Sequence, residues 1–94
     1  MSVADPAAVE IGEAVIFQTL EDEVVLLNMT SQEYYGLDDV GATMWNLLIE
    51  HRDVETVVGK LKDIYDADET RLRQDLLTLV QKLVEVDLLK KSTP

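Results

Sequence analysis

The sequence contains no cysteine and a single histidine, His51, in 94 residues. Disulfides, thiolate metal sites and thiol nucleophiles are therefore excluded, and one imidazole cannot supply a cluster of histidine ligands. No nucleophile pattern surrounds His51, whose expected place near the end of a helix suits a partner of the helix dipole. We therefore expect a protein that is not an enzyme and that needs no metal or cofactor.

Long hydrophobic runs are also missing. The longest aliphatic runs, such as Val24 to Leu27, cover only a few residues, whereas about 20 are needed to span a bilayer. The first residues lack the basic start and apolar stretch of a secretory signal, so a cytoplasmic protein is expected. With 47% hydrophobic and 29% charged residues the chain should fold as one domain. We expect a flexible tail over residues 1–12 and a folded domain over residues 13–91.

Basic residues are scarce, with 8 Lys and Arg against 19 Asp and Glu and a net charge of −11. Such a charge repels phosphate backbones and anionic lipids, so nucleic acid and membrane are not expected as partners. The first 37 residues contain seven acidic residues and no Lys or Arg. This acidity either serves solubility or creates a field that speeds capture of a basic or neutral peptide.

The hydrophobic period changes from about two to about 3.6 residues near Leu37, which divides the chain into strands followed by helices. The β-branched and apolar runs Ala14–Thr19 and Glu23–Met29 are separated by acidic residues that favour a hairpin turn. A second turn leads into the short run Glu33–Leu37. These runs predict a three-stranded antiparallel meander.

Three amphipathic helices are predicted after the strands. Asp38 or Asp39 should cap the first and Asp53 the second, and Asp66 with Glu69 resembles a capping box for the third. The helices are expected to end near residues 51, 65 and 86, and the third to begin near residue 67. The fold class predicted is α+β, winged helix-turn-helix-like, with the sheet packed on a helical trio.

The third helix carries an apolar arc that covers about half of its circumference, more than one neighbouring surface needs. Either the sheet and the other helices bury the whole arc, or one margin receives apolar side chains of a partner peptide. The arc is formed by Leu72, Leu76, Leu77, Leu79, Val80, Leu83, Val84 and Val86.

The run Glu33–Leu37 should be an edge strand, because it is short and comes last in the meander. An edge exposes unpaired N–H and C=O groups, to which an extended peptide can add itself. Gly36 would allow close approach of another backbone, or it marks only a kink. Tyr34 and Tyr35 should point to opposite faces, one inside and one outside, and the pattern leaves open which is which.

The segment from Leu27 to Trp45 resembles the PqqD-like family, named after coenzyme PQQ synthesis protein D and also known as RiPP precursor peptide recognition elements. The likeness extends over residues 14–89. Departures are Ser31 and Asp87, where the family usually has Gly, and Asp38, where it usually has Asn. The matching residues are Leu27, Asn28, Thr30, Tyr34, Tyr35, Leu37, Gly41, Trp45, Tyr65, Asp75, Leu88 and Leu89.

The resemblance implies a domain that binds the leader segment of a ribosomally made precursor peptide, which adds a strand to the third strand and packs on the third helix. It implies as partners the precursor and a leader peptidase or another maturation enzyme, with the protein a monomer or weak dimer. A lasso peptide setting is favoured over PQQ synthesis with a radical SAM enzyme. The peptide-binding residues implied are Glu33, Tyr34, Tyr35, Gly36, Leu37, Arg71, Leu72, Asp75, Leu76, Leu79, Lys82 and Leu83.

A winged-helix regulator that binds nucleic acid is the alternative from another class. It rests on analogy of fold alone. The third helix has no basic stripe, because its three basic residues are offset by three acidic ones. These residues are Arg71, Arg73 and Lys82 against Glu69, Asp75 and Glu85.

Overall fold

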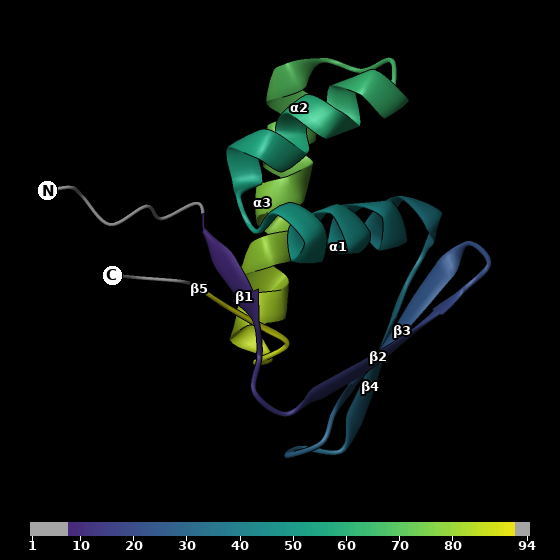
Figure 1. The fold of residues 1–94 in the computed structure, drawn as a ribbon, viewed down its shortest axis with the longest axis vertical. Helices are drawn as coiled ribbons and strands as arrows, with labels where there is room; N and C mark the ends of the chain where they lie inside the picture. The colour runs from purple at the N-terminus through teal and green to yellow at the C-terminus, as the bar shows by residue number, and fades with distance from the viewer. Residues whose placement is uncertain (1–7, 92–94) are drawn as a thin grey trace, which may run out of the picture.

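A computed structural model describes residues 8–91 of the chain and confirms the predicted α+β class (Figure 1). Its three helices follow four of the strands, and a fifth strand closes the described chain. No helix in this range is long and apolar enough to cross a membrane. The elements are β1 (Val9–Ile11), β2 (Val15–Leu20), β3 (Glu23–Asn28), β4 (Glu33–Leu37), α1 (Asp39–His51), α2 (Val54–Ile64), α3 (Glu69–Glu85) and β5 (Leu89–Lys91).

The predicted meander is confirmed as an antiparallel sheet of order β2-β3-β4. The hairpin between β2 and β3 closes at the pair Leu20 and Glu23, so its loop consists of two acidic residues. Along β3 the side chains alternate as a period of two requires, with Val24, Leu26 and Asn28 buried. This buried row makes β3 the central strand of the core face.

Strands β1 and β5 form a second, two-stranded antiparallel sheet that the sequence did not predict. Val9 pairs with Lys91 and is buried, and the N–H of Gly12 donates to the carbonyl of Leu88 at 3.0 Å. Residues 8–12 are therefore part of the fold, which corrects the predicted domain boundary at residue 13. Residues 8–12 join the domain because the apolar side chain of Val9 is buried in it. The rest of the predicted tail, residues 1–7, lies outside the described residues.

Aspartates cap all three helices. The Asp38 carboxylate accepts from the N–H of Gly41 at 2.8 Å, and Asp53 and Asp68 cap α2 and α3 in the same way. The predicted capping box of Asp66 with Glu69 is wrong. Because Asp68 is the N-cap, Glu69 becomes the first residue of α3, and its carboxylate pairs with basic side chains of α2 and α3 instead.

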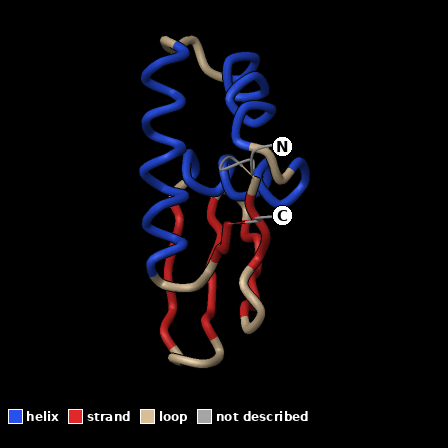
Figure 2. The backbone as a smooth tube through the Cα atoms, turned by 90° about the vertical axis from the view of Figure 1, so that its left-hand side faces the viewer, coloured by secondary structure: helices blue, strands red, loops and turns tan. Residues whose placement is uncertain are grey.

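The core lies between the helices and the sheet. Figure 2 shows the helices toward one end of the molecule and the strands toward the other, with α3 reaching from the helical end toward the strands. Trp45 of α1 is fully buried, as expected of a core residue, and meets the ring of Phe17 edge to face at 5.4 Å. This contact packs α1 against β2.

Candidate functional site

Strand β4 is the edge of the three-stranded sheet. It pairs with β3 on one side, and no strand in the described range pairs with its other side. Val24 lies opposite Leu37, and Asn28 lies opposite Glu33, so the whole length of β4 is aligned with the central strand. The predicted edge strand is therefore confirmed, and its outer backbone groups are available to another chain.

The ladder determines which residues of β4 offer those groups. The N–H of Met29 donates to the carbonyl of Ala14 at 2.8 Å, so in the β2–β3 pair Met29 points its backbone groups toward β2. Alternation along β3 then turns the groups of Leu26 toward β4, where its partner is Tyr35. The neighbours of Tyr35, Tyr34 and Gly36, therefore direct their N–H and C=O groups away from the sheet.

The side chains of β4 divide between two faces. Tyr35 and Leu37 are half-buried against the core, whereas Tyr34 is 71% exposed on the opposite face. This settles which tyrosine lies inside. The hydroxyl of Tyr35 donates to Oε1 of Glu33 at 3.1 Å, and its pKa is raised, first by desolvation and then by this carboxylate. A Cβ at Gly36 would meet nothing within 4 Å, so a second backbone can approach there.

Helix α3 buries only the middle of its apolar arc. Leu72, Leu76 and Leu83 belong to the closed core and present no open surface. At one margin Leu79 is half-buried, and at the other Leu77 is 44% exposed. Of the two alternatives, complete burial of the arc is therefore wrong, and both margins rather than one are partly open.

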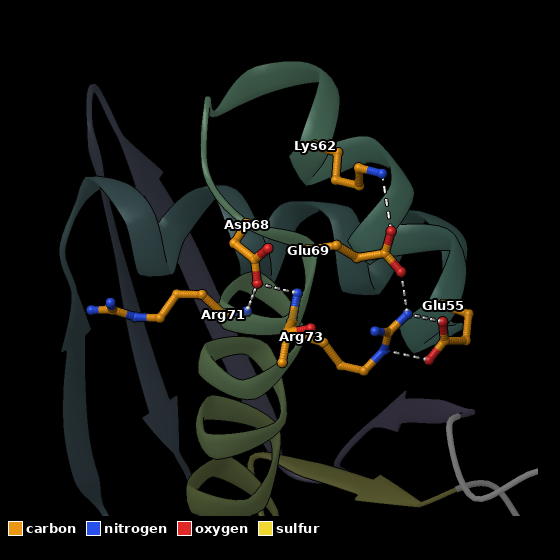
Figure 3. Close-up of polar contacts among 7 residues, drawn as sticks. Glu55, Lys62, Asp68, Glu69, Arg71 and Arg73 are labelled. Carbon is orange, nitrogen blue, oxygen red and sulfur yellow. Dashed lines mark hydrogen bonds and ion pairs between the residues drawn. The ribbon is translucent and has the colours of Figure 1, made fainter.

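One margin continues as a stripe along α3, at the spacing that places side chains on one helical face. This α3 stripe consists of Arg71, Asp75, Leu79, Lys82 and Val86. Its charged members are exposed, and Nε of Arg71 lies 3.5 Å from Oδ2 of Asp75. Figure 3 shows that Arg71 extends from α3 toward the side on which β4 runs into α1. The stripe therefore combines two apolar side chains, Leu79 and Val86, with three charged ones.

The opposite side of α3 is tied to α2 by an ion-pair network. The guanidinium of Arg73 binds both carboxylate oxygens of Glu55, with Nε–Oε2 at 3.0 Å and Nη2–Oε1 at 2.6 Å (Figure 3). It also contacts Glu69 at 3.0 Å, and Glu69 binds Lys62 at 3.0 Å. These hydrogen bonds lower the pKa of Glu55 and of Glu69. Arg73 is thus engaged within the fold rather than free for a ligand.

The outer face of the sheet is a second exposed apolar surface, which the sequence reasoning missed. Ile16, Leu27 and Tyr34 form one row across β2, β3 and β4, and Met29 is exposed beside them. A hollow of about 350 Å³ is lined by Leu27, Met29, Gln32 and Tyr34. Apolar residues on both faces of β3 were the available signal, since a strand with one wet face should alternate with polar residues.

Comparisons with known proteins agree with this arrangement. The family model of coenzyme PQQ synthesis protein D (PqqD) matches residues 23–89. A solved structure of TbiB1 in complex with the TbiA(beta) leader peptide is 33% identical and covers 90% of this chain and 99% of its own, with a TM-score of 0.84. A solved lasso peptide synthetase B1 complexed with the leader peptide is 24% identical over 88% and 98%, with a TM-score of 0.80, and shares the fold. Among curated proteins no match was found.

Proposed function

The chain belongs to the PqqD family, and from this premise we propose that it is a non-catalytic adaptor that binds the leader segment of a ribosomally made precursor peptide. The observation that carries the proposal is the free edge of β4 together with the α3 stripe, whose Arg71 extends toward the side on which β4 runs into α1 (Figure 3). TbiB1, the relative that is 33% identical, is a protein solved with a leader peptide, which supports the same class of ligand here.

The leader would bind as an added strand on β4. Its backbone would pair with the outward groups of Tyr34 and Gly36, and its alternate side chains would reach Leu79 and the charged side chains of the α3 stripe. Glu33, Tyr35 and Leu37 pair inward and would hold the edge straight. Of the helix positions that the resemblance implies, Leu72, Leu76 and Leu83 are buried in the core. They would support the α3 stripe from the core side rather than contact the peptide.

We further propose that the protein delivers the bound precursor to a leader peptidase or another maturation enzyme, which requires a surface that the bound leader leaves free. The outer face of the sheet meets this need, because its apolar row across β2, β3 and β4 points away from α3. The first 37 residues supply acidic side chains and no basic ones. A maturation enzyme that docked on this face would therefore be complementary if its own docking surface were apolar and surrounded by basic residues.

We propose a leader peptidase of the lasso type as that enzyme, with a radical SAM enzyme of PQQ synthesis as the alternative. The genes beside this one separate the two settings. A short precursor gene with a transglutaminase-like protease supports the first, and a radical SAM gene supports the second. Nothing in the described residues favours the nucleic-acid regulator, and the guanidinium of Arg73 is already paired with Glu55 and Glu69.

The direct experiment is a titration of a fluorescein-labelled synthetic leader, taken from the neighbouring precursor, followed by fluorescence anisotropy. We expect saturable binding in the micromolar range or tighter, and a scrambled leader as control should not bind. Absence of saturation at about 100 μM protein, about a hundred times a Kd of 1 μM, would reject the proposal.

Substitution at Gly36 tests the mode of binding. Gly36→Pro removes an N–H that points away from β3, so the sheet keeps its own hydrogen bonds while the leader loses one. We expect leader affinity to fall at least tenfold, or by about 1.4 kcal/mol. Gly36→Ala is the matched control, since its Cβ has open space and its N–H remains. Equal affinity of the two variants, both folded by circular dichroism, would place the peptide elsewhere.

A further inference from the structure

Asn28 is a buried polar residue whose side chain joins two parts of the fold. It is 5% exposed and lies at the end of β3, opposite Glu33 of β4. Its Oδ1 accepts from the N–H groups of Thr30 at 2.9 Å and Ser31 at 3.2 Å, which shapes the turn between β3 and β4. Its Nδ2 donates to the carbonyl of Val86 at 3.0 Å. One amide therefore holds the β3–β4 turn and the end of α3 together.

The carbonyl of Val86 is free to accept this bond because of the way α3 ends. The N–H of Asp87 donates to Val84 at 3.1 Å and that of Leu88 to Leu83 at 2.9 Å, the pattern of a Schellman motif. Asp87 has φ 61, a left-handed conformation that also explains why the resemblance leads one to expect Gly there. Val86, the C-cap, is left with an unpaired carbonyl, and Asn28 satisfies it.

The bond between Asn28 and Val86 lies at the end of β4 that follows the β3–β4 turn. At its far end β4 leads directly into α1, where Gly41 packs so closely that a Cβ would lie 3.3 Å from the Leu37 side chain. At the near end, among residues 8–91, no other side-chain hydrogen bond joins the three-stranded sheet to α3 or its C-cap. In Figure 1 the β3–β4 turn and the C-terminal end of α3 both lie toward the lower end of the molecule.

We propose that Asn28 is the positioning residue of the peptide site: it fixes the spacing between β4 and the α3 stripe without touching the peptide. This inference rests on the proposed function. A leader must contact β4 and the α3 stripe at the same time. Protein molecules in which the two are wrongly spaced cannot bind it, so the apparent affinity falls in proportion to the fraction of molecules with the right spacing. A bond that fixes the spacing of β4 and the α3 stripe before the leader binds removes that loss of affinity.

Two substitutions at Asn28 test the proposal. Asn28→Asp keeps an acceptor for Thr30 and Ser31 but sets a carboxylate against the Val86 carbonyl, and Asn28→Ser is too short to reach it. We expect both to weaken leader binding about tenfold, the size of one lost hydrogen bond, mainly through slower association in stopped-flow measurements. If Asn28→Asp does not fold, Asn28→Ser decides the question.

The control is Val57→Ala, a core substitution in α2 away from the site. We expect it to lower the Tm at least as much as Asn28→Ser while leader affinity stays within about twofold of the wild type. Wild-type affinity in a folded Asn28 variant overturns the positioning role. Equal losses of affinity in Val57→Ala and Asn28→Ser also overturn it, because they assign the effect to stability. Failure of the wild-type protein to bind the leader would instead reject the proposed function itself.

Discussion

At the scale of single residues, neighbours in the sequence have different roles because strand pairing determines which way the side chain and the backbone groups of each residue point. Tyr34 and Tyr35 are chemically identical, yet Tyr35 pairs with Leu26 and faces the core whereas Tyr34 is exposed and turns its backbone outward. The same division occurs on α3, where Leu79 belongs to the α3 stripe and Leu77 to the opposite margin. Position relative to neighbouring elements, rather than residue type, therefore decides which side chains can meet a peptide.

The pair Leu79 and Leu77 gives a test at this scale. Leu79→Ala removes the apolar side chain at the middle of the α3 stripe, and we expect leader affinity to fall roughly tenfold, in line with about 1.5 kcal/mol for a partly buried leucine. Leu77→Ala removes the same atoms from the other margin and should leave affinity unchanged. Isothermal titration calorimetry of both variants, with Tm values as a control for folding, measures the difference. A larger loss for Leu77→Ala would move the peptide to the other side of α3.

At the scale of elements, α3 is held on one side so that its other side can remain open. Arg73 and Glu69 connect α3 to Glu55 and Lys62 of α2. The groups are largely exposed, so the network positions the helices more than it stabilises them. The α3 stripe, from Arg71 to Val86, is thereby left for contacts outside the helical hairpin.

The network predicts a dependence of stability on pH. The pKa values of Glu55 and Glu69 lie below their ordinary value of 4.5, because hydrogen bonds from Arg73 and Lys62 favour the carboxylates. The folded protein thus binds fewer protons than the unfolded chain, so this contribution is complete above pH 4.5 and is lost as the pH falls through the lowered pKa values.

Arg73→Met should therefore lower the Tm at pH 7, and the difference from the wild type should shrink below the ordinary carboxyl pKa. Thermal unfolding followed by circular dichroism over this pH range measures it. Arg71→Met is the matched control, because its only ion pair in the described chain, to Asp75 at 3.5 Å, stays within α3. A pH-independent difference for Arg73→Met would show that packing of the arginine stem, rather than its charge, links the helices.

At the scale of the whole molecule, charge is distributed unevenly over the fold. All eight basic residues follow residue 37, so the strands β1 to β4 carry only acidic charges. The basic residues of the α3 stripe are Arg71 and Lys82, and both are exposed. A field of this kind acts on the rate of encounter more than on the lifetime of a complex.

The field predicts that the charge of a leader changes its association rate. A synthetic leader extended by two lysines should associate faster than the same leader extended by two glutamates at low salt. The difference should largely vanish at about 0.5 M NaCl, where the Debye length is only a few ångströms. Dissociation rates, measured in the same stopped-flow experiments, should be similar for both peptides. Equal association rates at low salt would leave the acidity as a device for solubility alone.

The sequence by itself determined the fold class, the meander, the three helices and two of their caps, because periods of two and 3.6 and capping side chains act locally. It also indicated the edge strand, and the resemblance gave the family. Only the tertiary structure decided the pairing of β1 with β5, since strands separated by most of the chain leave no local signal. It likewise decided which tyrosine lies inside and which leucines of α3 are closed. The bond from Asn28 to Val86 joins residues 58 positions apart, so it exists only once sheet and helix have packed.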